Sequence, residues 1–178
     1  VTPGILAVLR AHRAHATFFV IGSHAEQHPE LVEAIRAGGH ELGNHFYLDR
    51  PSIALDDDEL VAMLLKTDAL IRPAGPRKWC RPGSGWIDQR MIALLADHDY
   101  HPCLASVYPL DLTTPPWFNQ WHFVANARPG AILVLHDGGP ERAGTIATLE
   151  AVLPRLQERG FRVVTVSELW AMRRGAAP

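Results

Sequence analysis

The chain of 178 residues has the composition of an ordinary globular protein, with 47% hydrophobic and 20% charged residues. Its formal net charge of −2 gives no excess of positive charge, so we expect no nucleic-acid partner. No apolar run reaches the roughly 18 residues that a membrane-spanning helix needs. We therefore expect a single domain over residues 1–178, without a membrane span.

The first residue is Val1 rather than a methionine, and the chain enters an apolar helical pattern at once. We interpret the sequence as a fragment that lacks its N-terminal edge. A signal peptide therefore cannot be judged, and the sequence predicts no localisation. Cys80 and Cys103 are the two cysteines. They could form one bridge or remain buried thiols, and the sequence leaves both readings open.

Short apolar runs alternate with longer amphipathic segments along the chain. The β-branched and aromatic residues 16–21, for example, indicate a buried strand that ends at Gly22. The first predicted elements are a helix over 5–14, this strand, a helix over 29–36, a strand over 40–45 and a helix from 56 to about 71. They are followed by a strand over 78–81, a helix over 88–97, a strand over 100–106 and a helix over 117–127.

The C-terminal part repeats the alternation. Residues 131–135 are five apolar residues between Gly130 and His136, which predicts a strand. A long helix over 145–159, a strand over 161–166 and a closing helix through Met172 follow, and Ser167 is the predicted N-cap. The fold class is therefore α/β, with a parallel sheet that forms an incomplete (β/α) barrel or a doubly wound sheet.

Polar residues that directly follow the predicted strands form three candidate sites. They are His45 with Asp49, the segment from Arg81 to Trp86, and His136 with the residues after it. In parallel α/β folds, functional residues gather where strands end and loops begin. The three sites can therefore converge on one cleft.

His45 and Asp49 are four residues apart, which places both side chains on one side of a helical turn. An imidazole and a carboxylate are a partial ligand set for zinc or another divalent ion. The alternative is a loop histidine that hydrogen-bonds the backbone, with Asp49 pairing with Arg50 or capping a turn.

His136 ends an apolar strand, where an ionisable side chain has no packing role. It can serve as a general acid or base near neutral pH, or be a hydrogen-bonded histidine in a tight turn. Arg81 can hold a carboxylate through its guanidinium, or form a weak surface ion pair. The loop around Ser84 can offer backbone N–H groups to a ligand, or be only a flexible turn.

The ordered set of segments resembles the polysaccharide deacetylase family, also called the NodB-homology domain or carbohydrate esterase family 4. The matching segments are residues 16–22 (ATFFVIG), 39–45 (GHELGNH), 81–82 (RP), 133–137 (LVLHD) and 159–169 (RGFRVVTVSEL). The resemblance implies a distorted (β/α) barrel with fewer than eight strands, its first strand missing here. The implied activity is metal-dependent hydrolysis of N- or O-linked acetyl groups on an acetylated oligo- or polysaccharide.

The resemblance also assigns roles to residues of this chain. His45 and Asp49 take the positions of metal ligands, for zinc above all, with manganese, cobalt or nickel as other candidates. His136 takes the position of the acid, Arg81 that of the arginine which holds the catalytic aspartate, and Asp111 that of a carboxylate orienting the histidine. Ser84 falls where the family offers a backbone N–H to the oxyanion.

The chain departs from the family pattern in three places. The paired aspartates of the first motif would precede Val1, so we expect the 178-residue chain alone to be inactive or nearly so. Asp49 replaces a histidine, which gives a harder site and a metal preference shifted from zinc. Gly83 and Ser84 replace a proline and an aromatic residue, so Trp86 or Trp117 would supply the aromatic platform for a sugar ring.

Two other functions stay open at this point. The first is a non-catalytic carbohydrate-binding domain on the same fold, which the missing aspartate pair and Asp49 favour. The second is a hydrolase of another non-peptide C–N bond, such as that of a cyclic ureide or a formamide, because fold does not fix the substrate.

Overall fold

The computed structural model describes residues 1–138 and 143–175. The chain divides into two compact units, one formed by residues 17–104 and the other by residues 1–16 with 105–178. The single domain over residues 1–178 stays a prediction. Within the described residues, no helix is long and apolar enough to cross a membrane.

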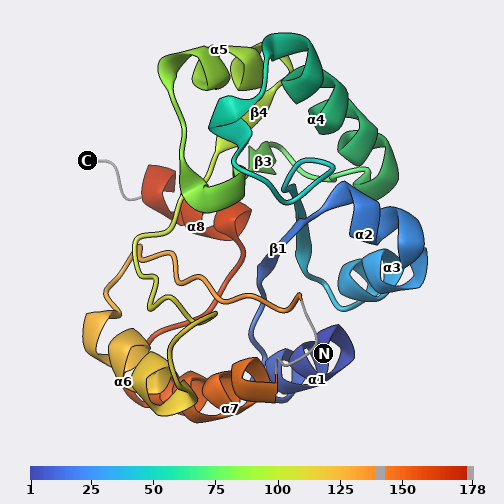
Figure 1. Cartoon of the computed structure of the whole chain (residues 1–178). Coiled ribbons are helices and arrows are strands. Elements are labelled where there is room, and N and C mark those ends of the chain that lie inside the picture. The colour runs from blue at the N-terminus through green and yellow to red at the C-terminus, as the bar shows by residue number, and fades with distance from the viewer. Residues whose placement is uncertain (139–142, 176–178) are drawn as a thin grey trace. The chain divides into compact units, whose positions relative to one another are not determined.

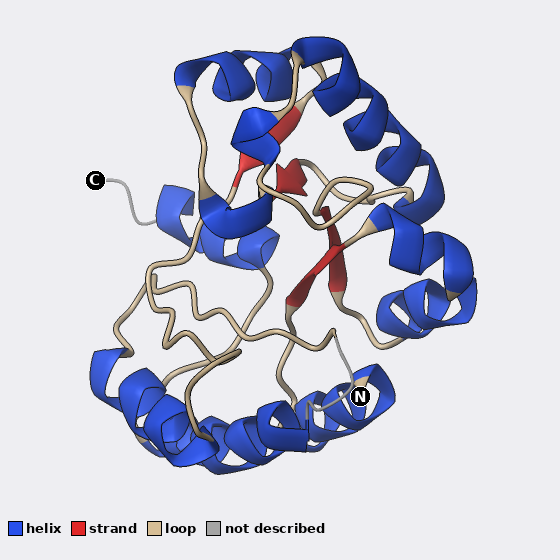
Figure 2. Cartoon of the chain, viewed as in Figure 1, coloured by secondary structure: helices blue, strands red, loops and turns tan. Residues whose placement is uncertain are grey.

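The unit of residues 17–104 contains a parallel sheet of four strands in the order β1-β2-β3-β4. The strands are β1 (Thr17–Val20), β2 (Glu41–Asn44), β3 (Lys78–Cys80) and β4 (Tyr100–Pro102), drawn in red in Figure 2. The connections contain α2 (Gly22–Gln27), α3 (Pro29–Ala37), α4 (Asp57–Ile71) and α5 (Gln89–Asp97), with two short 3₁₀ helices, η1 (Ser52–Ala54) and η2 (Gly83–Gly85). The predicted α/β class with a parallel sheet is thus confirmed.

Local sequence explains where two helices of this unit, α4 and α5, begin. The side chain of Asp56 accepts a hydrogen bond from the Glu59 N–H at the start of α4, and Asp88 accepts one from the Met91 N–H at the start of α5. Both helices bury apolar residues against the sheet in one core cluster. Its fully buried members include Leu60, Leu64, Met91, Leu95 and Tyr100.

In its described residues, the other unit contains the helices α1 (Thr2–Ala11), α6 (Pro116–Asn126), α7 (Ala143–Glu158) and α8 (Val166–Gly175), which Figure 1 labels. Its core cluster joins Val107, Phe123 and Ala127 to Val152 and Leu156 of α7.

Two predicted strands of this unit are wrong. Residues 131–135 form only one isolated parallel bridge, between Leu133 and Val107, and residues 161–166 form no strand. Figure 2 draws both segments as loop up to the start of α8. Leu133 and Val163 do pack against the core cluster, so the apolar pattern reports burial correctly. A strand also needs a ladder of backbone hydrogen bonds, and the described backbone supplies only part of one.

The N-cap of the closing helix is Thr165 and not Ser167. The Thr165 hydroxyl accepts a hydrogen bond from the Glu168 N–H at 3.2 Å, and the Glu168 carboxylate accepts one from the Thr165 N–H at 2.7 Å. This reciprocal pair is a capping box, which satisfies two backbone donors at once. The helix therefore begins two residues earlier than predicted, at Val166, and runs beyond Met172 to Gly175.

Candidate active site

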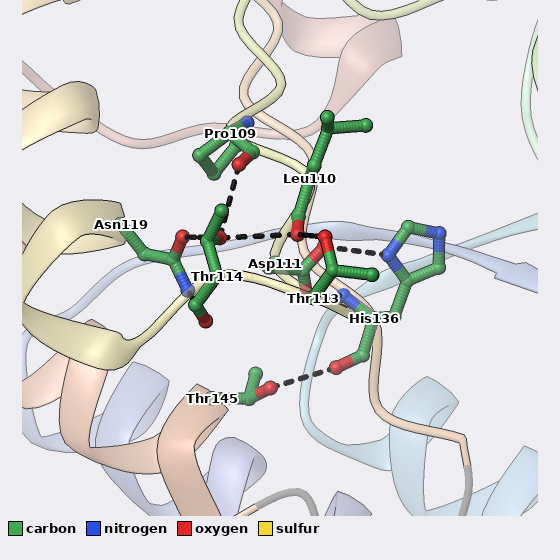
Figure 3. A network of polar contacts seen from close by, with 8 residues as sticks. All are labelled: Pro109, Leu110, Asp111, Thr113, Thr114, Asn119, His136 and Thr145. Atoms are coloured by element: carbon green, nitrogen blue, oxygen red, sulfur yellow. Dashed lines mark hydrogen bonds and ion pairs between the residues drawn. The ribbon is translucent and has the colours of Figure 1, made fainter.

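His136 and Asp111 form a closely bonded pair. The Asp111 carboxylate accepts a hydrogen bond from the His136 backbone N–H at 2.8 Å through Oδ2, and its Oδ1 lies 2.8 Å from His136 Nδ1. A carboxylate can only accept a hydrogen bond, so Nδ1 of His136 carries the proton in this contact. The other ring nitrogen, Nε2, is not bonded to Asp111. Figure 3 shows the imidazole lying against the carboxylate.

Burial differs between the two members of this pair. The Asp111 side chain is 2% exposed, whereas that of His136 is 36% exposed. The ring of Tyr108 lies beside the imidazole, with 5.6 Å between ring centroids. The bridge between Val107 and Leu133 brings together the two segments that carry Asp111 and His136. The arrangement can hold a proton on an accessible imidazole with its orientation set by a buried carboxylate.

His45 follows β2 in the other unit and hydrogen-bonds the backbone. Its N–H donates to the Val20 carbonyl, and its Nδ1 donates to the carbonyl of Arg81. A histidine whose Nδ1–H is bonded to a carbonyl has its lone pair on Nε2, which is the usual state of a metal ligand. The same contact is the backbone hydrogen bond of the alternative interpretation of His45, so the metal role stays a prediction.

Asp49 does not lie on a helical turn with His45. Residues 45–49 form loop and bends, so the geometric reason for pairing the two side chains is wrong. Asp49 is exposed, and Arg50 makes its ion pair with Glu59 instead. Across residues 1–138 and 143–175, no group of three or more His, Cys, Asp or Glu side chains is arranged to hold a metal ion. These residues thus offer one oriented ligand and not a complete set.

Arg81 directly follows β3, and its guanidinium bonds to neighbouring protein groups. Its Nε donates to the Cys103 carbonyl at 3.1 Å, and the guanidinium carbon lies 4.1 Å from the centre of the Phe19 ring. Burial lowers the pKa of Arg81. In the part of the chain that the structure describes, no carboxylate pairs with it. The predicted surface ion pair is therefore not found.

Asn44, immediately before His45, is fully buried and anchors the loop that carries the histidine. Its amide donates to the Leu64 carbonyl at 3.0 Å and to the Tyr100 hydroxyl at 3.1 Å. Its Oδ1 accepts from the N–H of Phe46, whose φ of +59° is left-handed. These contacts pin the backbone on both sides of His45, a role that the sequence did not reveal.

The loop at Ser84 is shaped by a close backbone approach. A Cβ on Gly83 would lie 2.1 Å from the Arg50 carbonyl oxygen, and the Gly83 N–H donates to the buried hydroxyl of Ser52. Ser84 is exposed and has a φ of +60°. The two predicted aromatic platforms are both open to solvent, with Trp86 67% and Trp117 68% exposed.

The structure thus brings together Asp111 with His136, and His45 with the backbone of Arg81. Asp49, Ser84, Trp86 and Trp117 are exposed and belong to neither pair. Because the two pairs belong to different units, their convergence on one cleft stays a prediction. Both cysteines are free thiols and buried, which resolves the question that the sequence left open.

The family model for polysaccharide deacetylases matches residues 1–103. A peptidoglycan-N-acetylglucosamine deacetylase of Bacillus cereus is 36% identical over 177 residues, covering 94% of this chain and 81% of the relative. A chitooligosaccharide deacetylase of Rhizobium leguminosarum bv. trifolii is 33% identical over 175 residues, covering 90% and 81%.

Solved structures show the same likeness. The peptidoglycan N-acetylglucosamine deacetylase Bc1960 has a TM-score of 0.89 at 29% identity, covering 94% of this chain and 80% of that one. BA3943 of Bacillus anthracis, described as a pseudoenzyme of carbohydrate esterase family 4, has a TM-score of 0.85 at 27% identity, covering 94% and 59%. The sequence segments, the α/β fold and these likenesses agree, and this chain belongs to the polysaccharide deacetylase family.

Proposed function

We propose that this protein hydrolyses the acetyl group from N-acetylglucosamine units of a carbohydrate such as peptidoglycan or a chito-oligosaccharide. Relatives that are 33–36% identical over nearly the whole chain carry those activities in their names. The observation that carries the proposal within this chain is the pair of His136 and Asp111. An accessible imidazole held by a buried carboxylate is suited to proton transfer at a carbonyl group.

His136 is the proposed general acid. With Nδ1 bonded to Asp111, Nε2 is the ring nitrogen that can give a proton to the departing amine or alcohol. Asp111 keeps the ring in one tautomer and in one orientation. Its burial keeps water from competing for the Nδ1 proton.

A divalent metal, zinc first among the candidates, is the proposed cofactor. Such an ion would lower the pKa of a bound water and polarise the acetyl carbonyl. His45, with its Nδ1 already bonded to a carbonyl, is the ligand that the geometry favours, and Asp49 is proposed as a second. Because the described residues lack a complete ligand set, the proposed site needs a further donor.

The remaining predicted residues are proposed to bind the substrate or its charges. Arg81 carries a partly buried guanidinium without a carboxylate in the described chain, and is proposed to hold the catalytic carboxylate. The backbone at Ser84 is proposed to donate to the oxyanion. Trp86 and Trp117 present indole rings on which a sugar face can stack.

The test uses the full-length protein as its gene encodes it. Acetate release is measured from acetylated chito-oligosaccharide and from peptidoglycan, with zinc, manganese, cobalt or nickel added and the bound metal quantified. We expect release from at least one substrate and its loss in His136→Ala. No release from either substrate with metal bound would contradict the proposal.

A non-catalytic carbohydrate-binding role is the second candidate, and the similarity to a pseudoenzyme of the same family favours it. The same experiment separates the two. Glycan binding that is unchanged in His136→Ala, without acetate release by the unmodified protein, would support the binding role.

A further inference from the structure

Helix α7 contacts the backbone of His136 through one threonine. The Thr145 hydroxyl donates a hydrogen bond to the His136 carbonyl at 2.8 Å, although the residues are nine positions apart. Thr145 is 6% exposed and lies in the first turn of the helix. Figure 3 shows this bond on the side of His136 away from Asp111.

Three polar atoms of His136 therefore have assigned acceptors or donors. Asp111 accepts from the backbone N–H and from Nδ1, and Thr145 donates to the carbonyl. Bonds at both backbone groups fix the direction of the Cα–Cβ vector, and the bond at Nδ1 fixes the ring about it. Among the described residues, Thr145 makes the only hydrogen bond to the His136 carbonyl. Removing the Thr145 hydroxyl would therefore leave this carbonyl without a hydrogen-bond donor from the described chain.

The turn that carries Asp111 is held by hydrogen bonds that do not involve Thr145. The carbonyl of Leu110, the residue before Asp111, accepts hydrogen bonds from the N–H groups of Thr113 and Thr114 at 2.8 and 3.1 Å. The hydroxyl of Thr114 lies 3.0 Å from the same carbonyl and 2.5 Å from the Oδ1 of buried Asn119 in α6. A hydroxyl has one proton and donates to one acceptor at a time, but the turn before α6 is held in either case.

We propose that Thr145 is a positioning residue for the acid–base function of His136, acting through the histidine's backbone carbonyl. The inference rests on the proposed function of His136. Asp111 sets the tautomer, whereas Thr145 sets where the imidazole stands relative to the carbonyl under attack. Catalysis is sensitive to such placement, because a displacement of about 1 Å can lower the rate about 100-fold.

The same helix offers a matched control. Thr148 lies one turn beyond Thr145 and is fully buried, but its hydroxyl has no hydrogen-bond partner among the described residues. Valine replaces threonine with almost the same shape and without the hydroxyl. Thr145→Val and Thr148→Val thus make the same chemical change in the same helix, and only the first removes a bond to His136.

Acetate release by the metal-loaded full-length protein is the first measurement. We expect Thr145→Val to lower kcat about tenfold or more with KM unchanged, Thr148→Val to leave both unchanged, and Thr145→Ser to restore kcat. If Thr145 had only a structural role, Thr145→Val would lower the midpoint of thermal unfolding without lowering kcat at unchanged KM. Equal kcat values for Thr145→Val and Thr148→Val would overturn the proposal, as would failure of Thr145→Ser to restore kcat.

A second measurement does not depend on activity. The Nδ1 proton of His136 is followed by NMR and assigned by its loss in His136→Gln. We expect its exchange with water to be about tenfold faster in Thr145→Val and unchanged in Thr148→Val. If the unmodified protein releases no acetate, the proposed function fails, and the exchange rates still decide whether Thr145 holds the histidine. Equal exchange in the two variants would refute that.

Discussion

The two carboxylate oxygens of Asp111 bond two different groups of one residue, His136. Oδ2 accepts from its backbone N–H and Oδ1 lies against its Nδ1, both at 2.8 Å. The Asp111 carboxylate therefore fixes both the imidazole ring and the backbone of His136. Each of the two N–H donors of His136 needs an oxygen atom as its acceptor. An amide in place of the carboxylate supplies only one.

Asp111→Asn should therefore be nearly as damaging as loss of the histidine. The amide NH₂ would face one of the two donors, so either the backbone bond or the Nδ1 bond is lost. We expect kcat to fall about 10²–10⁴-fold, as for His136→Ala. In the double variant the two losses should not add, because the residues act as a unit. Additive losses would show that Asp111 acts elsewhere.

Metal binding should depend strongly on His45 and be tunable at Asp49. We expect His45→Gln to lower zinc affinity by at least about tenfold, because it removes the imidazole whose Nδ1 is already bonded to the Arg81 carbonyl. Asp49→His should raise the preference for zinc over manganese, since imidazole is the softer ligand. Competition with a chromophoric chelator measures both constants.

His28 provides the control for these metal variants. It is an exposed histidine that bonds Glu30 and has no proposed role in metal binding. His28→Gln should leave zinc affinity unchanged. An Asp49→His variant with the metal preference of the unmodified protein would remove Asp49 from the ligand set.

Stability should fall at alkaline pH because of buried acids in the unit of residues 17–104. Burial raises the pKa of the thiols of Cys80 and Cys103 and of the Tyr100 hydroxyl. Above the thiol pKa of about 8.5 in an unfolded chain, the unfolded state releases protons that the native state keeps. The unfolded state then binds fewer protons, so the free energy of unfolding decreases as pH rises.

The measurement is the urea midpoint at pH 7 and at pH 9.5. A Cys80→Ala/Cys103→Ala variant has a lower starting stability but should lose less of it between the two pH values. An equally steep loss in that variant would assign the effect to other groups.

The sequence predicted all four strands of residues 17–104, most clearly β1, whose β-branched and aromatic residues precede Gly22, although the strand predicted over 100–106 ends at Pro102. Residues 16–21 and 78–81 were placed within one or two positions of β1 and β3. The run at 131–135 has the same pattern but forms one bridge. Hydrophobicity reports burial, whereas strand formation also depends on a neighbouring backbone, which lies elsewhere in the sequence.

The candidate site was predictable only where a local signal exists. His136 stood out because an ionisable residue ends an apolar run. Thr145 and Asn119 did not, because their contacts become visible only after folding. The capping box of Thr165 and Glu168 could have been predicted, because a threonine followed three residues later by a glutamate is a known sequence pattern for the start of a helix.

Trp117 should contribute to glycan binding more than a neighbouring tryptophan does. Trp117 and Trp121 lie one turn apart on α6 and are 68% and 58% exposed. Trp117 is closer in sequence to the turn that carries Asp111, so we expect Trp117→Ala to raise KM about tenfold and Trp121→Ala to change it little. Equal effects would indicate a broad aromatic surface instead of one platform.

Gly83→Ala should destabilise the loop that carries Ser84. The added Cβ would lie 2.1 Å from the Arg50 carbonyl oxygen, and a backbone atom cannot move aside as a flexible side chain can. We expect a loss of about 1–3 kcal/mol in the free energy of unfolding. Gly175→Ala is the control and should be neutral, because no described atom outside its own helix lies within 4 Å of the added Cβ. Ser52→Ala should lose about 1–3 kcal/mol as well, because the Gly83 N–H loses its acceptor. Urea denaturation of the three variants measures these losses, and a Gly83→Ala variant as stable as Gly175→Ala would mean that the chain at Arg50 moves away from Gly83.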